Sequence, residues 1–151
     1  MKRLFIALIA LTSILTANAQ NNDRLTVVVS NDGQLVGRYV RQTATTYIAN
    51  PVDWEEEVPK KGYRVEVWTP EKGKGFVCRR PGVTGNINVR KGPSTRTAVV
   101  STITEADGEK DYPDNTFQCL GKTNGWYKIS INGKIGYVRE DLVNWDFADL
   151  F

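Results

Sequence analysis

The sequence predicts an all-β protein, because short alternating strands and glycine-marked turns recur along most of its length. Three such turns lie in the second half, at Gly92-Pro93, Asn124-Gly125 and Asn132-Gly133. The first follows Ile87 to Arg90, where apolar and polar residues alternate with strand spacing, and the proline forbids the strand from continuing. With 151 residues, 40% of them hydrophobic, the chain is long enough for one domain or two small ones.

The N-terminus has the features of a secretory signal peptide over residues 1–19. Lys2-Arg3 is a basic start, residues 4–15 are almost all apolar, and Ala17-Asn18-Ala19 supplies a small-x-small cleavage site. The alternative is a membrane-spanning helix, which requires about 20 apolar residues, and this run is shorter. We expect export to the periplasm or the medium, a mature chain that begins at Gln20, and no stable membrane insertion after cleavage.

The charge balance argues against nucleic acid as a partner. Of the 20 Lys and Arg residues, Lys2 and Arg3 fall in the predicted leader, which leaves 18 against 17 Asp and Glu residues. A net charge near +1 provides no clustered basic face that would attract a polyanion.

Composition also limits catalysis. The chain contains no histidine, so Ser-His and Cys-His nucleophilic pairs and the usual His-bearing zinc sites are excluded. A carboxylate-only hydrolase requires a pair of Asp or Glu residues. The one dense acidic cluster is Asp53, Glu55, Glu56 and Glu57 beside Trp54, and such a run is typical of a solvated loop. We expect a protein that is not an enzyme, with no catalytic residue, no metal site and no cofactor.

Residues 20–74 form the first predicted region, which is rich in β-strands. Asp32-Gly33 separates two apolar runs, Leu25 to Val29 and Leu35 to Val40, and predicts a hairpin. Further strands are predicted over Thr43 to Ala49 and Tyr63 to Trp68.

The second region, residues 75–151, carries three motifs in a fixed order. They are NVRKGPS at residues 88–94, NGWYKI at 124–129 and NGKIGYV at 132–138. Together they resemble the bacterial SH3 domain family. The resemblance implies a small SH3-like barrel whose first strand is Gly75 to Arg79, with Ala98 to Ile103 as a later strand and a short turn near Leu142. The chain departs from the family pattern at Glu105 to Asn115, a longer acidic loop.

A weak internal echo leaves two interpretations of the first region open. Residues 62–77 resemble residues 126–138, since each combines an alternating strand, a glycine turn and a second strand. Residues 20–74 are then a second, diverged SH3-like barrel. Alternatively, the likeness is one that any two β-hairpins share.

The family resemblance implies binding, with cell-wall peptidoglycan as the expected ligand. Arg90 suits a bidentate contact with a peptide carboxylate, and Tyr112, Trp126 or Tyr137 suits stacking on a sugar or peptide. Each has a structural alternative: Arg90 pairs with Asp141, Trp126 packs one end of the barrel, or Tyr112 folds its own loop. The second functional hypothesis is a periplasmic protein–protein adaptor or inhibitor, whose partner meets the acidic loop and the first region.

Two further features concern stability. Cys78 and Cys119 are an even pair in a chain expected to be exported, so they are disulfide candidates; the alternative is two separate buried thiols. The C-terminal residues 144–151 are apolar enough to dock, and we expect them to pack across the seam between the two regions.

Overall fold

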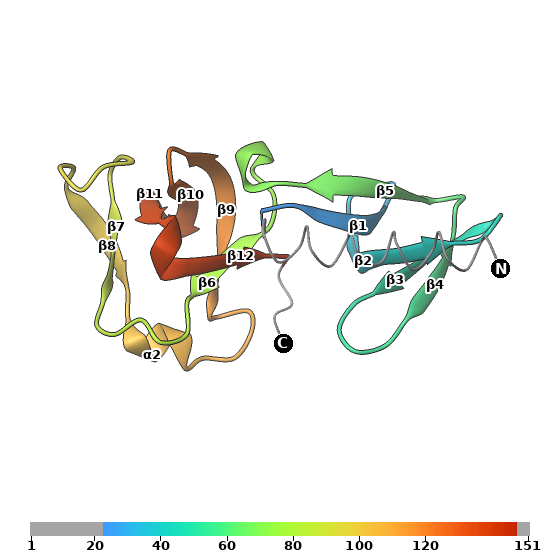
Figure 1. Ribbon diagram of the computed structural model, residues 1–151, viewed down its shortest axis with the longest axis horizontal. Coiled ribbons are helices and arrows are strands. Elements are labelled where there is room, and N and C mark those ends of the chain that lie inside the picture. The colour runs from blue at the N-terminus through green and yellow to red at the C-terminus, as the bar shows by residue number, and fades with distance from the viewer. Residues whose placement is uncertain (1–22, 148–151) are drawn as a thin grey trace, which may run out of the picture.

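The computed structural model describes residues 23–147, and it consists of two antiparallel sheets that lie end to end (Figure 1). The predicted signal peptide and residues 148–151 lie outside the described residues. The N-terminal sheet has the order β4-β3-β2-β1-β5. Its strands are β1 (Leu25–Ser30), β2 (Leu35–Gln42), β3 (Thr46–Asn50), β4 (Glu56–Pro59) and β5 (Tyr63–Trp68).

The C-terminal sheet has seven strands in the order β12-β6-β9-β10-β11-β7-β8. They are β6 (Phe76–Arg79), β7 (Ile87–Arg90), β8 (Val99–Ile103), β9 (Thr116–Thr123), β10 (Trp126–Ile131), β11 (Lys134–Arg139) and β12 (Val143–Asp146). The described residues also include three short helices: η1 (Pro70–Lys72), α2 (Glu105–Gly108) and η2 (Glu140–Leu142). Among the described residues, no helix is both long and apolar enough to cross a membrane.

The predicted hairpins are confirmed, and their turns explain why the sequence signal was strong. Asn124 and Asn132 have φ angles of 48° and 51°, and the glycine after each is also at positive φ. Two successive residues at positive φ match the right-handed twist of a hairpin, and Asn-Gly adopts this geometry at low cost. These turns join β9 to β10 and β10 to β11, which places the second and third motifs on adjacent strands.

Two predictions about the loops need correction. Glu56 and Glu57 were expected in a solvated loop, but they belong to β4, an edge strand paired with β3. The acidic stretch Glu105 to Asn115 is not all loop either, since it begins with α2. Thr104 and Asp107 form a capping box there, in which each side chain accepts a hydrogen bond from the other residue's backbone N–H.

The main core is continuous between the two sheets. Val27, Val29 and Trp68 of the N-terminal sheet belong to the same buried cluster as Ile87 and Ile129 of the C-terminal sheet. On the opposite face of the N-terminal sheet lies a smaller cluster of Val28, Ala49 and Val58. Because alternate residues of β1 point to opposite faces, one strand serves both clusters.

The described part of the C-terminal tail packs across the seam, as predicted. β12 pairs with β6 and continues toward the N-terminal sheet (Figure 1). There Asp146 accepts hydrogen bonds of 2.7 and 2.8 Å from Arg38 of β2, whose guanidinium lies 4.8 Å from the ring centroid of Phe147. The tail therefore ties the two sheets together through a charged pair and an aromatic ring.

Cys78 and Cys119 are free thiols in the structure, so the candidate disulfide is not formed. Cys78 of β6 lies opposite Thr116, whereas the backbone N–H of Cys119 bonds to Gly75 O. An offset of three residues places the two side chains about 10 Å apart along the strands and on opposite faces. A bridge requires Cα atoms within about 7 Å.

Candidate binding face

The outer face of β10, β11 and β7 carries a row of cationic and aromatic side chains. Lys128 lies opposite Tyr137, and Tyr137 lies opposite Arg90, so the three residues cross the sheet at one level. Their neighbours Val89, Ile129 and Val138 are fully buried, which sends the row to the outer face because strand residues alternate. We call Arg90, Lys128 and Tyr137 the cationic row; it spans about 10 Å, two inter-strand spacings.

Trp126 lies on the same face of the sheet. It precedes Lys128 by two residues on β10 and lies opposite Arg139, which makes it a diagonal neighbour of Tyr137. Only 9% of Trp126 is exposed. Trp126 is therefore almost fully covered, consistent with the packing role considered above.

Arg90 is held in position by its own hairpin. Its Nη1 donates a 2.9 Å hydrogen bond to the carbonyl of Thr97, across the turn that joins β7 to β8. The Gly92-Pro93 turn is closed by Thr97, whose hydroxyl donates to Gly92 O at 3.0 Å. The motif thus acts as scaffold, and it fixes the direction of the Arg90 side chain.

The cationic row has no carboxylate partner within residues 23–147. Asp141, the partner considered for Arg90, instead forms a 2.7 Å ion pair with Arg139. No ion pair within 4.0 Å involves Arg90 or Lys128 in this part of the chain. A partly buried guanidinium and an ammonium that flank a tyrosine ring are suited to a ligand carboxylate with a flat group beside it.

Tyr112 lies away from this face. It follows α2, and α2 begins just after Ile103, which pairs with Ile87 at the start of β7. Arg90 lies at the other end of β7, opposite Val99. The structure therefore brings together Arg90, Tyr137 and Trp126, and it leaves Tyr112, which is 42% exposed, in a separate loop.

Lys128 was missed by the sequence reasoning. The signal was present, because the alternation that buries Tyr127 and Ile129 sends Lys128 outward. Aromatic residues were considered for stacking, and Trp126 was therefore selected and not Lys128.

The acidic cluster of the N-terminal half is engaged in surface pairs. Glu55 makes hydrogen bonds of 2.7 and 2.8 Å with Arg41, and Glu57 accepts a 2.7 Å bond from Thr46. The hydrogen bond from Arg41 lowers the pKa of Glu55, and its slight burial works in the opposite direction. A carboxyl held ionised in this way is poorly suited to donate a proton as a general acid.

Comparison with known proteins agrees with the C-terminal architecture. A model of the bacterial SH3 domain family matches residues 85–144. The match contains β7 to β11, part of β12 and the whole cationic row, while the N-terminal sheet and β6 lie outside it. No curated protein matches the chain. The C-terminal half of this protein therefore contains a bacterial SH3 domain, a binding module.

Proposed function

We propose that this protein is an exported, non-catalytic binding module that recognises peptidoglycan peptides on the cationic row. The observation that carries the proposal is the register Lys128–Tyr137–Arg90, which presents two cations on either side of an aromatic ring. Neither cation forms an ion pair within residues 23–147. Peptidoglycan stems are short peptides that carry carboxylates. Arg90 forms the bidentate contact, Tyr137 lies against the peptide or sugar, and Lys128 adds a second positive charge.

Export and the absence of catalysis are part of the proposal. The basic start, apolar run and small-x-small site of residues 1–19 support export. The lack of histidine and the surface pairing of Glu55 support a role in binding rather than turnover. Incubation of the protein with purified peptidoglycan is expected to release no soluble fragments, and sustained release would contradict this part.

Co-sedimentation with purified peptidoglycan tests the binding proposal. Wild type is expected to sediment with the polymer. Arg90→Ala and Tyr137→Ala are each expected to weaken binding about ten-fold, which corresponds to about 1.4 kcal/mol, within the range for a charge-assisted contact that remains partly solvated. Arg90→Lys keeps the charge but loses the planar fork, so its binding should fall between wild type and Arg90→Ala.

Two control variants test whether binding depends on the cationic row or on positive charge and aromatic side chains in general. Lys61→Ala removes an exposed cation of the N-terminal half, and Tyr112→Ala removes an exposed tyrosine of the SH3 domain outside the row. Circular dichroism checks that each variant is folded. Failure of folded wild type to sediment, or equal losses in row and control variants, would overturn the proposal.

Exposed apolar residues of the N-terminal half favour a second candidate, a protein–protein adaptor or inhibitor. Val40, Val52, Trp54 and Val65 are 36% to 54% exposed and lie outside the SH3 match. Trp54 is the largest of them, and large exposed aromatics are common anchors of protein interfaces. A protein that co-purifies in stoichiometric amount with wild type, but not with Trp54→Ala or a variant lacking residues 107–115, would favour this candidate.

A further inference from the structure

A second site lies on the inner side of the SH3 sheet, away from the cationic row. A cleft of about 300 Å³ opens beside β12 and η2, and its walls include Tyr127, Arg80, Trp145 and two carboxylates, Glu140 and Asp141. Asp141 is paired with Arg139. Tyr127 and Lys128 are consecutive on β10 and point to opposite faces, so the cleft and the row are on different sides of the sheet.

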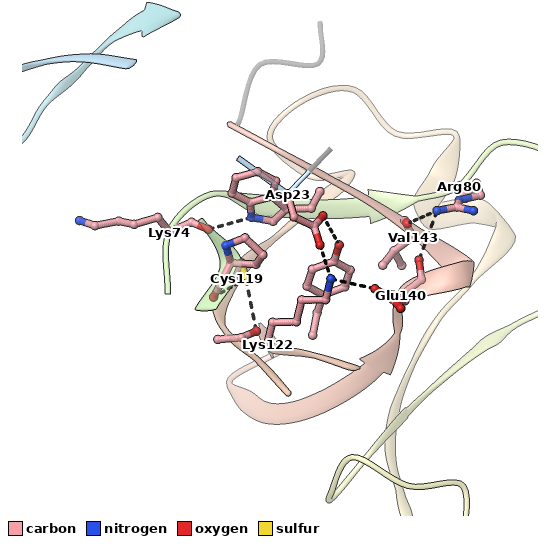
Figure 2. A network of polar contacts seen from close by, with 11 residues as sticks. Asp23, Lys74, Arg80, Cys119, Lys122, Glu140 and Val143 are labelled. Atoms are coloured by element: carbon pink, nitrogen blue, oxygen red, sulfur yellow. Dashed lines mark hydrogen bonds and ion pairs between the residues drawn. The ribbon is translucent and has the colours of Figure 1, made fainter. Parts of the chain in front are cut away.

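A carboxylate from the N-terminal region fills one end of this cleft. Asp23 accepts a 2.9 Å hydrogen bond from the hydroxyl of Tyr127 and forms a salt bridge with Lys122 (Figure 2). Lys122 also pairs with Glu140 at 2.8 Å. The two donors belong to the SH3 domain, whereas Asp23 lies 62 positions before the start of the family match at residue 85.

Lys122 and Tyr127, the two donors, are buried against each other. Lys122 and Tyr127 face each other across β9 and β10, and the Lys122 ammonium lies 5.1 Å from the Tyr127 ring centroid. Only 15% of the Lys122 side chain and 3% of Tyr127 are exposed. Buried donors of this kind require an acceptor, because an unpaired one loses the hydrogen bond it made with water.

Both donors keep their protons at neutral pH. Burial raises the pKa of Tyr127, and the hydrogen bond to Asp23 raises it further. For Lys122, burial works to lower the pKa, but the hydrogen bonds with Asp23 and Glu140 outweigh it and the pKa is raised. Lys122 and Tyr127 therefore both remain hydrogen-bond donors for an anion at neutral pH.

The position of Asp23 and a neighbouring arginine both favour exchange of this carboxylate for one from a ligand. Asp23 precedes Leu25, the first position of β1 that pairs with β5, so its side chain can leave without breaking the ladder. Arg80, on the wall of the same cleft, forms no ion pair in the described part of the chain and donates to the carbonyls of Glu140 and Val143 at 3.3 and 3.2 Å. Its guanidinium provides a second contact for a peptide that enters the cleft.

We propose that Lys122, Tyr127 and Arg80 form a recognition pocket for a peptide carboxylate, which Asp23 occupies in the unliganded protein. A ligand then binds by displacing Asp23, so the Asp23 carboxylate competes with the carboxylate of the ligand. This inference takes the class of ligand, a carboxylate-bearing peptide, from the proposed function, but it assigns a different surface.

The test uses N-acetylalanylalanine, a peptide with one carboxylate, titrated into the ¹⁵N-labelled protein and followed by NMR. Asp23→Ala empties the pocket and is expected to bind the peptide at least ten-fold more tightly than wild type. Adding Lys122→Met to Asp23→Ala should remove that gain, and the C-terminal amide of the peptide should not bind. Asp23→Asn keeps the size of the side chain and should bind more tightly than wild type if Asp23→Ala does not fold.

Peptide binding by these variants distinguishes a recognition pocket from a contact that only ties the two halves together. Unchanged or weaker peptide binding by folded Asp23→Ala and Asp23→Asn would overturn the pocket. A lower melting temperature of the same variants would then identify Asp23 as a tie between the two halves. Peptidoglycan co-sedimentation that depends on Arg90 would still support the proposed function in that case. Conversely, Lys122-dependent peptide binding without co-sedimentation would contradict the cell-wall proposal and support the pocket.

Discussion

The five strands of the N-terminal sheet have the same order as five strands of the C-terminal sheet, but the segments that link the first two of these five strands differ. In the N-terminal sheet, β1 lies between the last strand, β5, and the second, β2, with β3 and β4 beyond; in the C-terminal sheet, β6 lies between β12 and β9, with β10 and β11 beyond. The link is residues 31–34 in the first sheet and residues 80–115 in the second. The difference is an insertion that contains the β7–β8 hairpin and α2 (Figure 1).

The insertion creates the candidate binding face. It supplies β7, which pairs with β11 and sets Arg90 beside Tyr137. In the N-terminal sheet the strand in the position of β11 is β4, an edge strand with no neighbour beyond it. The comparison teaches that a shared strand order does not by itself provide a binding site, which here depends on an added hairpin.

A buried arginine anchors the insertion. Arg79, at the end of β6, donates to Val83 O at 2.7 Å and to Ile103 O at 3.2 Å, carbonyls on either side of the β7–β8 hairpin. Its side chain is 8% exposed. The short turn of the N-terminal sheet has no segment that would require such an anchor.

The largest expected effect tests the difference between the two cores. Ile129→Ala removes a fully buried side chain from the continuous cluster and should lower the free energy of unfolding by about 2–5 kcal/mol. Val58→Ala removes less volume from the three-residue cluster and should cost about 1–2 kcal/mol. Urea unfolding at equilibrium measures both. A cost for Val58→Ala equal to that of Ile129→Ala would contradict the ranking of the cores.

A somewhat smaller effect is expected where the insertion meets the barrel. A Cβ at Gly136 would lie 2.5 Å from Val89 Cγ1 and 3.0 Å from Arg90 O, so Gly136→Ala pushes β7 away from β11. We expect a loss of about 1–3 kcal/mol in stability, together with weaker peptidoglycan binding.

Gly121→Ala is the matched control for that substitution, because its Cβ meets only Lys128 Cβ at 3.9 Å. Its stability should stay within about 0.5 kcal/mol of wild type. If Gly136→Ala and Gly121→Ala unfold at the same urea concentration, β7 and β11 do not approach each other as closely as the structure shows.

The seam between the sheets is expected to respond to pH. Burial raises the pKa of Asp146, and the charge of Arg38 opposes that rise without cancelling it. A raised carboxyl pKa means that the folded state holds the proton more tightly, so stability falls as the pH rises from the usual Asp value through the raised one. Arg38→Ala should therefore cost about 1 kcal/mol near pH 7 and less near pH 4.

Urea unfolding of wild type and Arg38→Ala at the two pH values measures this dependence. Asp146→Asn, which removes the titrating group, should flatten the difference between them. An equal cost of Arg38→Ala at both pH values would show that the guanidinium acts through its packing on Phe147 rather than through its charge.

The smallest expected effect concerns the thiols. Denatured, unreduced protein should titrate with two free thiols, and a reducing agent should leave the melting temperature unchanged. Burial raises the pKa of Cys119 to about 11, which keeps it unreactive in the folded state. Detection of no free thiol would contradict the strand register between β6 and β9.

Local signals predicted most of the C-terminal fold. Asn-Gly turns and alternating apolar residues define β10 and β11 without reference to the rest of the chain, and both strands were predicted. The sequence echo between the two halves does not follow the topology, because it matches β5 to β10, whereas the strand orders match β5 to β12. Hairpins look alike locally, and only the pairing of distant strands distinguishes their positions.

The site was predicted less completely, for the same physical reason. The alternation of apolar and polar residues over 87–90 points Arg90 away from the buried Val89. Its position beside Tyr137 and Lys128, however, depends on the pairing of β7 with β11, between residues about fifty positions apart. Tyr112 was grouped with them because an aromatic ring suits stacking on a ligand, but its loop lies away from the face. The contact of Asp23 with Lys122 joins residues 99 positions apart, and no local pattern marks it.

The central claim is that the inserted hairpin and β10–β11 form the ligand face of the protein. NMR titration of the ¹⁵N-labelled protein with soluble peptidoglycan fragments tests it most directly. The account predicts that the largest amide shifts fall on Arg90, Lys128 and Tyr137, and that they are lost in Arg90→Ala but kept in Lys61→Ala. Largest shifts in β1 to β5, or in the loop around Tyr112, would contradict it.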